Sequence, residues 1–251
     1  MSVKFPDHFS GHAASYARHR PHYPDALYQW IAQQAPAHVR GWDVATGSGQ
    51  AARGLIDHFD EVIATDASAA QLSHATAQAP GLRFQQALAE DSGLPGGSVD
   101  AITVAAGLHW FDRERFFAEV RRVARPGACL VAWTYTATQQ VDGHPQPAFL
   151  QQFVEETLGP HWPPQFFEIP GLYQPERFPF TAIPTPSFQA QEQWSLEAFI
   201  GHIQTWSGYA RARTAMGVEP IALIREPLGA WWAGGTRTVT WDLFVYAGRV
   251  G

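Results

Sequence analysis

The N-terminal half of the chain alternates between short apolar runs and stretches with the apolar spacing of a helix. The runs that read as buried strands fall at residues 41–45, 61–66, 100–106 and 128–134, with a half-exposed strand at 82–88. The helical spacing falls between them, at residues 24–34, 50–56, 68–78 and 112–124. Strands and helices that alternate in this way predict a parallel sheet with right-handed crossovers.

The composition changes at about Thr136. Eight of the 19 prolines fall between Pro160 and Pro186, and six of the ten tryptophans follow Gly159. Helical patterns recur at residues 146–158, 195–206 and 219–232, and residues 236–247 alternate as a final strand. We expect an α/β fold with a seven-stranded, mostly parallel sheet, an antiparallel member near the C-terminus, and a helical, proline-rich cap.

The same pattern suggests four parts. Residues 1–36 would form an N-terminal flap and helix, and residues 37–136 the α/β core. Residues 137–185 would be a cap inserted over the C-terminal edge of the sheet, where open α/β sheets bind ligands. Residues 186–251 would complete the sheet.

A glycine-rich turn follows the first predicted strand, in the segment Trp-Asp-Val-Ala-Thr-Gly-Ser-Gly-Gln at 42–50. Gly47 and Gly49 lack a Cβ, so a ligand can approach the backbone, and the helix that follows offers unpaired N–H groups. Residues 47–52 satisfy the dinucleotide pattern G-x-G-x-x-A. Asp43 argues against a dinucleotide, because an acid in a buried strand is costly unless it serves a cationic ligand or the loop. S-adenosylmethionine (SAM) carries an ammonium and a sulfonium and has no pyrophosphate, so it suits Asp43.

Asp66 ends the second predicted strand. A carboxylate at that position can accept hydrogen bonds from both hydroxyls of a ribose. Because SAM and NAD share that ribose, Asp66 supports a nucleoside without choosing between them. The competing interpretation of the glycine turn is an ordinary tight connection between strand and helix.

Composition limits the partners. The net charge is −6, with sixteen arginines, one lysine and no basic run, which disfavours nucleic acid. The one cysteine, Cys129, cannot form an intrachain disulfide, and no cysteine spacing of metal-site type occurs. With no apolar segment of signal-peptide or membrane-spanning type, we expect a cytoplasmic protein without a membrane or metal partner, as a monomer or homodimer.

Residues 8–23 carry two tyrosines, two arginines and four histidines but no clear apolar face. They are either a surface arm or, as we favour, a flap that closes over a ligand. In the second case Tyr16 and Tyr23 would exclude water, and Arg20 would meet a carboxylate of SAM or of the methyl acceptor.

Five short motifs resemble, in order, those of class I SAM-dependent methyltransferases. They lie at residues 43–49, 64–66, 89–91, 98–100 and 123–130. The segment His-Trp-Phe-Asp at 109–112, the N-terminal aromatic and arginine residues, and Thr-Trp-Ser at 205–207 are similar to the trans-aconitate methyltransferase-like subgroup. One departure is that this chain has Ala45-Thr46 where the family commonly has Gly-Cys.

The resemblance implies a role for each matching position around the cofactor. The backbone at Ala45, Gly47 and Gly49 would line the methionine part of SAM, and Asp43 would orient its ammonium. The remaining expected contacts are with the ribose, the adenine and the sulfonium: Asp66 on the ribose, Ala67 beside the adenine, Ala89 and Glu90 at the adenine edge, and Ala105 beside the sulfonium.

His109 and Trp110 would stand beside the site of transfer. His109 has an equally good alternative, in which it only caps the helix that begins at Asp112 and packs against Trp110. A carboxylate acceptor needs no general base, whereas an amine, phenol or carbon acid does. The candidates for such a base are His109, His19, His22 and the tyrosines.

Three functions are therefore open. The first is methyl transfer from SAM to a small molecule, with a carboxylic acid held by Arg18 or Arg20 as the candidate acceptor. The second is a SAM- or nucleoside-binding regulatory protein that transfers nothing. The third is a dinucleotide-dependent oxidoreductase, which Asp43 disfavours.

Overall fold

The computed structural model describes residues 19–75 and 79–251. Within them, one mixed sheet has the order β3-β2-β1-β4-β5-β9-β7, with β6 paired to β5 and β8 paired to β9. The strands are β1 Arg40–Val44, β2 Glu61–Asp66, β3 Leu82–Gln86, β4 Val99–Ala105, β5 Ala124–Val141, β6 His144–Pro145, β7 Thr181–Ala182, β8 Gln189–Ser195 and β9 Thr236–Arg249.

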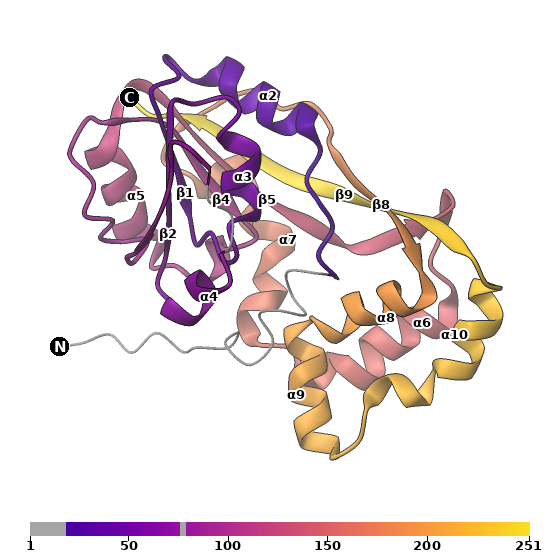
Figure 1. Cartoon of the computed structure of the whole chain (residues 1–251). Helices are drawn as coiled ribbons and strands as arrows, with labels where there is room; N and C mark the ends of the chain where they lie inside the picture. Colours follow the sequence, from indigo (N-terminus) through magenta and orange to yellow (C-terminus); the bar gives the residue numbers. More distant parts are fainter. Residues whose placement is uncertain (1–18, 76–78) are drawn as a thin grey trace.

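The first five strands pair in parallel; β1, β2 and β4 are buried along almost their whole length, whereas the edge strand β3 is largely exposed. On one face, α2 Asp25–Gln34 and α3 Gln50–Leu55 pack on apolar side chains of β2 and β5. On the other face, α5 Arg113–Val123 packs on Trp42, Ile102 and Val104 through Phe116 and Val120. Figure 1 shows this arrangement, with α2 and α3 on one side of the sheet and α5 on the other. The parallel sheet predicted from alternating strands and helices is confirmed.

Helices α6 Ala148–Gln152, α8 Leu196–Gln204, α9 Ser207–Met216 and α10 Arg225–Trp232 form a second lobe, which we call the helical lobe, at the lower right of Figure 1. A separate apolar cluster holds it together, built from these helices, β8 and the ends of β5 and β9. The two other helices are α4 Ala69–Ser73, which contacts β2 and β3, and α7 Ile169–Leu172. A π-helical turn, Phe153–Leu158, continues α6.

The long strands β5 and β9 join the two lobes. β4 ends at Ala105, opposite Trp133, but β5 continues to Val141. Over this extension β5 pairs antiparallel with β9, and at its end also with β6. The whole ladder between β5 and β9 runs from Cys129 opposite Arg249 to Val141 opposite Val239. The antiparallel C-terminal strand predicted from residues 236–247 is confirmed.

The antiparallel part is larger than the single strand we expected. β8 pairs with β9 over Gln189–Ser195, a segment whose pattern did not predict a strand. Ala190 and Trp194 are buried, but the residues between them are polar: Gln191 and Gln193 are exposed and Glu192 is partly buried. The sequence hides this strand because only two of its seven positions contribute to the core.

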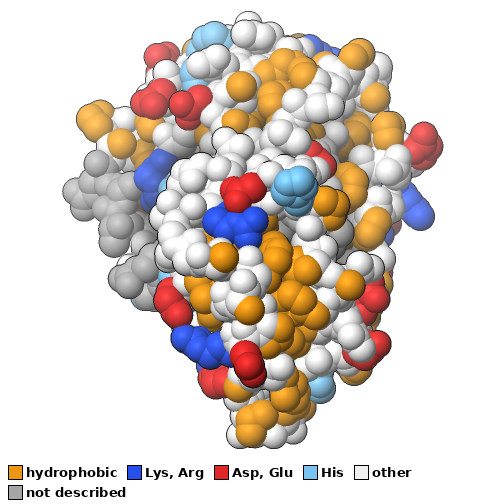
Figure 2. Space-filling view, turned by 90° about the vertical axis from the view of Figure 1, so that its right-hand side faces the viewer, with side chains coloured by type: hydrophobic (Ala, Val, Ile, Leu, Met, Phe, Trp, Pro, Cys, Tyr) orange, Lys and Arg blue, Asp and Glu red, His pale blue; other side chains and the backbone are white. Residues whose placement is uncertain are grey.

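The side view in Figure 2 shows how charge is distributed on the face that carries β8 and β9 in Figure 1. Lys and Arg side chains stand singly there, several of them beside an acidic side chain, and do not form a basic patch. Arg237 of β9 forms an ion pair with Asp142, in which the Nε and Oδ2 atoms lie 2.7 Å apart.

Asp100 ties the start of β1 to the start of β4. Its carboxylate is fully buried and accepts hydrogen bonds from the backbone N–H groups of Val39 (3.0 Å) and Arg40 (2.8 Å). The guanidinium of Arg125 donates to both carboxylate oxygens, at 3.0 and 3.1 Å.

We expect Asp100→Ala to lower the free energy of unfolding by about 3–5 kcal/mol, because it leaves a half-buried guanidinium and two N–H groups without their acceptor. Chemical denaturation measures the change. Asp91→Ala, at an exposed position outside the helices, is the control and should change stability by less than about 0.5 kcal/mol. Equal losses of stability in the two variants would refute the role of Asp100 in connecting β1 and β4.

Candidate active site

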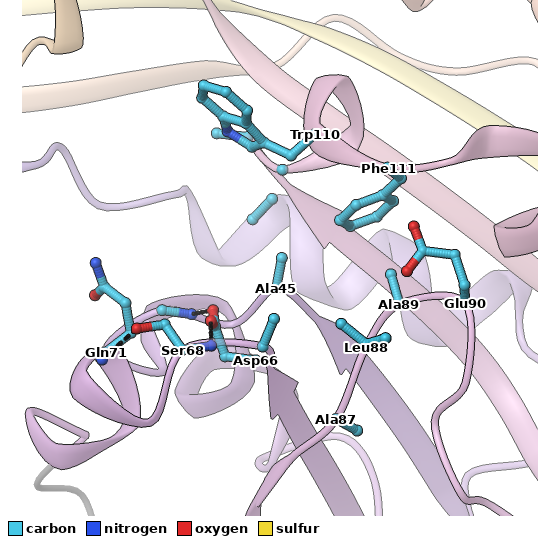
Figure 3. A pocket seen from close by; sticks show the side chains of 15 residues that line it. Ala45, Asp66, Ser68, Gln71, Ala87, Leu88, Ala89, Glu90, Trp110 and Phe111 are labelled. Atoms are coloured by element: carbon cyan, nitrogen blue, oxygen red, sulfur yellow. Dashed lines mark hydrogen bonds between the residues drawn. The ribbon is translucent and has the colours of Figure 1, made fainter. Parts of the chain in front are cut away.

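A cavity of about 790 Å³, which we call the sheet cavity, lies at the C-terminal ends of β1, β2 and β4. Much of its wall is alanine or glycine, so backbone atoms are within reach of a ligand (Figure 3). The lining residues are Ala45, Gly47, Asp66, Ala67, Ser68, Gln71, Ala87, Leu88, Ala89, Glu90, Ala105, Ala106, Gly107, Trp110 and Phe111.

The chain turns sharply where β1 and β4 end at this cavity. Gly47 and Gly49 have positive φ angles of 57° and 84°. Ala45 and Ala106 also have φ of 54°, a left-handed conformation that costs an alanine about 1–2 kcal/mol. Strain of this kind is typical of functional sites, and both alanines line the cavity.

Asp66 holds the floor of the sheet cavity. Its Oδ2 accepts the N–H of Gly47 at 2.8 Å, and its Oδ1 accepts the N–H of Ser68 at 2.8 Å. Figure 3 shows these two bonds, with Glu90 and Phe111 together at the opposite side of the cavity. The carboxylate therefore fixes the glycine turn to the loop after β2.

The charges that line the sheet cavity are both negative. They are Asp66 and Glu90, and no Lys or Arg is among the lining residues that the structure describes. The Glu90 carboxylate also accepts the N–H of Asp112 at 2.8 Å. Gln71 contributes an Oε1 atom that is buried and lacks a hydrogen-bond partner among the described residues. The cavity thus suits a ligand with positive charge and spare donors.

Asp43 lies behind the turn and is not among the lining residues. It is fully buried and accepts hydrogen bonds from the hydroxyls of Thr46 (2.6 Å) and Thr103 (2.7 Å). Burial raises the pKa of Asp43 to about 6, against the opposing effect of these two hydroxyls. Its contacts connect β1, the glycine turn and β4.

A second cavity of about 960 Å³, which we call the aromatic cavity, lies between the sheet and the helical lobe. It shares Ala106 and Trp110 with the sheet cavity, so the two adjoin. Its lining residues also include Arg20, His109, Thr134, Tyr135, Thr136, Gln139, Val154, Trp162, Phe166, Ile169, His202, Trp206, Ser207 and Trp241. Aromatic rings dominate this wall; Trp162 and Phe166 are stacked with centroids 3.9 Å apart.

Two histidines in the aromatic cavity are neutral at physiological pH. Burial, and secondarily the charge of Arg20, lowers the pKa of His109 to about 4 and that of His202 to about 3. His202 donates from Nδ1 to the carbonyl of His19 (2.9 Å) and accepts from the indole of Trp206 (3.3 Å). The Nδ1 of His109 is buried and has no hydrogen-bond partner in the described chain.

Residues 19–23 contact both the helix that follows the glycine turn and the wall of the aromatic cavity. The carbonyl of Pro21 accepts hydrogen bonds from the side chains of Gln50 (2.8 Å), next to the glycine turn, and Tyr135 (2.6 Å). The backbone N–H and the Nδ1 of His22 both lie 2.7 Å from a carboxylate oxygen of Glu192 on β8. These contacts hold Arg20 at the aromatic cavity.

The structure brings most of the residues expected from the sequence to these two cavities. Those in the sheet cavity are Ala45, Gly47, Asp66, Ala67, Ala89, Glu90 and Ala105; Trp110 belongs to both, and Arg20 and His109 to the aromatic cavity. Asp43 and Gly49 are not lining residues, and Tyr16 lies outside the described residues.

Several lining residues had no signal in the sequence. Ser68, Gln71 and Gln139 were not expected at the site, and Phe111 was noted only as part of the segment at 109–112. The left-handed backbone of Ala106 cannot be inferred from its residue type. Trp162 lies in a part of the chain where only a high tryptophan content was visible, and Trp241 lies in the predicted final strand without a sign that it lines a cavity.

Comparison with known proteins agrees with this geometry. Residues 42–132 match the family model described as a methyltransferase domain. A protein of Dictyostelium discoideum, provisionally named a methyltransferase, is 30% identical over 228 residues, which cover 90% of this chain and 86% of that protein. The chain belongs to the class I SAM-dependent methyltransferases. The protein is thus an enzyme that uses SAM as its methyl donor.

Two further relatives extend the comparison. A solved structure from Anaeromyxobacter dehalogenans, provisionally described as a type II methyltransferase, is 38% identical with a TM-score of 0.83, and covers 92% of this chain and 98% of that one. An uncharacterized methyltransferase of Mycobacterium tuberculosis is 34% identical over 122 residues, 49% of each chain. The similarity to the Anaeromyxobacter structure extends over the helical lobe, whereas the family model matches residues 42–132, which precede that lobe.

The sheet cavity fits SAM. Both its charges are acidic, as a cofactor with an ammonium and a sulfonium requires, and a Cβ built on Gly47 would meet only the Oε1 of Gln71, at 3.9 Å. Within residues 19–75 and 79–251, no group of three or more His, Cys, Asp or Glu side chains could hold a metal ion. The helices of these residues are also too short or too polar to cross a membrane.

Asp43 gives the enzyme a pH-dependent stability. Below about pH 3 the carboxyl is protonated in both the folded and the unfolded state. As the pH rises to 6 and above, the unfolded chain loses this proton more readily, so the free energy of unfolding falls by about 3 kcal/mol.

We therefore expect Asp43→Asn to match the wild-type protein at about pH 3 and to be more stable by about 2–3 kcal/mol above pH 6.5. Urea denaturation across this pH range measures the difference. Asp60→Asn, at an exposed position, should show no such pH dependence. A constant difference at every pH would show that Asp43 does not titrate in this range.

Proposed function

We propose that the enzyme transfers a methyl group from SAM to a carboxylate oxygen of a small molecule held in the aromatic cavity. The observation that carries this proposal is the charge of that cavity: Arg20 supplies a cation, and no Asp or Glu is among its described lining residues. A guanidinium pairs with a carboxylate through two parallel hydrogen bonds. The aromatic wall suits an apolar acceptor body.

Each wall of the sheet cavity takes one part of SAM in this proposal. Asp66 accepts the ribose hydroxyls, and Ala67, Ala89 and Glu90 surround the adenine. Ala45 and the glycine turn face the methionine part, with Asp43 supporting the turn from behind through Thr46. Ala105 borders the sulfonium, whose methyl group is the electrophile that SAM supplies.

The remaining residues bring the acceptor to the shared wall. Ala106 and Trp110 border both cavities, so an acceptor there lies next to the donor, and proximity and alignment carry most of the rate of an in-line displacement. A carboxylate is already ionised at neutral pH, so no proton has to leave during transfer. His109, neutral and with an unpartnered Nδ1, is available to accept a hydrogen bond from a protonated acceptor.

Asp66→Ala should weaken SAM binding by about 1–3 kcal/mol, which is about 5- to 150-fold in the dissociation constant. The structure adds that the variant also loses stability, because Gly47 and Ser68 lose the acceptor for their N–H groups. Calorimetry and thermal melting measure the two effects. Asp60→Ala is the matched control for charge, and an unchanged SAM affinity in Asp66→Ala would refute the ribose contact.

Substitutions of Arg20 test whether it binds the carboxylate of the acceptor. With a panel of arylalkanoic acids, we expect wild-type enzyme to form S-adenosylhomocysteine and a methyl ester detectable by mass. Arg20→Gln should raise the KM for the acid at least about tenfold. The KM of Arg20→Lys should lie between those of the wild-type enzyme and Arg20→Gln, because lysine keeps the positive charge but lacks the paired N–H donors of a guanidinium. The affinity for SAM should stay unchanged, since Arg20 does not line the sheet cavity.

Arg115→Gln, an exposed arginine on α5, is the control. Equal KM values for Arg20→Gln and the wild-type enzyme would refute the carboxylate contact. Tight SAM binding without turnover, for the panel and for a metabolite extract, would favour the alternative of a regulatory SAM-binding protein. The closure of residues 8–23 over the ligand stays a prediction.

A further inference from the structure

Gln139 is a buried polar group that the transfer reaction does not use. It lies on the extension of β5, is 2% exposed, and lines the aromatic cavity. Its Nε2 is buried and finds no hydrogen-bond partner among the described residues. A buried amide left in this way costs about 1–3 kcal/mol, so a ligand that satisfies it gains that free energy.

The position of Gln139 sets its distance from the site of transfer. Ala105 pairs with Trp133 on β5, and Trp133 lies opposite Val245 of β9. Gln139 lies opposite Trp241 of the same strand, because a bulge takes up the residues between Tyr135 and Gln139. Four residues of β9 separate the two levels, which is about 13 Å along the ladder.

Aromatic side chains fill the wall between these two levels. Tyr135 and Trp241 have ring centroids 6.4 Å apart, and Trp162 lies 6.1 Å from Trp206 across the helical lobe. These rings offer flat apolar surface. Of the polar lining residues, His109 lies beside Trp110 at the wall shared with the sheet cavity, and Gln139 lies on the extension of β5 opposite Trp241.

We propose that Gln139 is a specificity-determining residue that selects extended acceptors. The preferred substrate is a carboxylic acid with a flat, aromatic or unsaturated body and a second oxygen about 10 Å from the carboxylate. The carboxylate lies at Arg20 and Trp110, the body lies between the tryptophans, and the distal oxygen accepts a hydrogen bond from the amide of Gln139. This inference rests on the proposed function for the identity of the reacting group.

The test uses two acids that differ only at the distal atom, 4-(4-acetylphenyl)butanoate and 4-(4-isopropylphenyl)butanoate. Binding to the enzyme loaded with S-adenosylhomocysteine is measured by calorimetry, and methyl-ester formation from SAM is measured separately. We expect wild-type enzyme to bind the ketone at least about tenfold more tightly than its isostere. Gln139→Leu should remove that preference and leave the affinity for the isopropyl acid unchanged or improved.

Gln140→Leu is the matched control, since Gln140 is the next residue on β5 and is exposed. It should keep the preference. Gln139→Leu should melt no lower than the wild-type enzyme, because it removes an unsatisfied amide rather than a hydrogen bond. A clear loss of melting temperature would mean that Gln139 serves the fold, which overturns the inference.

The two proposals can fail separately. Equal affinities for the two acids, a preference that survives Gln139→Leu, or no binding of either acid would overturn the role of Gln139. A preference that Gln139→Leu abolishes, in an enzyme that forms no methyl ester from either acid, would support Gln139 and refute carboxylate methylation.

Discussion

The antiparallel ladder between β5 and β9 is the constraint on which the rest of the molecule depends. A parallel sheet ends where its strands end, and here β4 stops at Ala105. β5 continues because β9 runs beside it and satisfies its backbone, as far as Val141 opposite Val239. That extension supplies a floor for the helical lobe and one wall of the aromatic cavity. The aromatic cavity exists because the ladder between β5 and β9 extends beyond the end of the parallel sheet.

Local signals made the cofactor half of the site predictable. The glycine turn, the acid at the end of β2 and the helix that begins after Asp112 each depend on a few consecutive residues, and the structure shows all three. Gln139 could not be found in this way. Its burial depends on pairing with Trp241, a contact between distant parts of the chain, and β8 was missed because its exposed face is polar. Side chains whose setting depends on distant pairing stay invisible to local pattern.

Asp43 and Asp66, the two acids near the glycine turn, differ in their contacts because they lie at different depths. Asp66 faces the sheet cavity, and its carboxyl group accepts hydrogen bonds from two backbone N–H groups. Asp43 lies one layer deeper, bonded to two threonine hydroxyls, and burial shifts its pKa upward. The first is placed to meet a ligand, and the second braces the loop that meets it. Sequence spacing identified both acids but could not separate these tasks.

The separate origins of the two cavities have a consequence for how such an enzyme can diversify. The lining of the sheet cavity comes from one continuous stretch, residues 45–111, whereas the aromatic cavity draws on residues from Arg20 to Trp241. Among the described residues, only Ala106 and Trp110 belong to both. In the function proposed above, mutations in the helical lobe can therefore change the acceptor cavity while the lining of the sheet cavity stays the same. Enzymes with this arrangement can acquire new substrates without changes in the residues that bind the methyl donor.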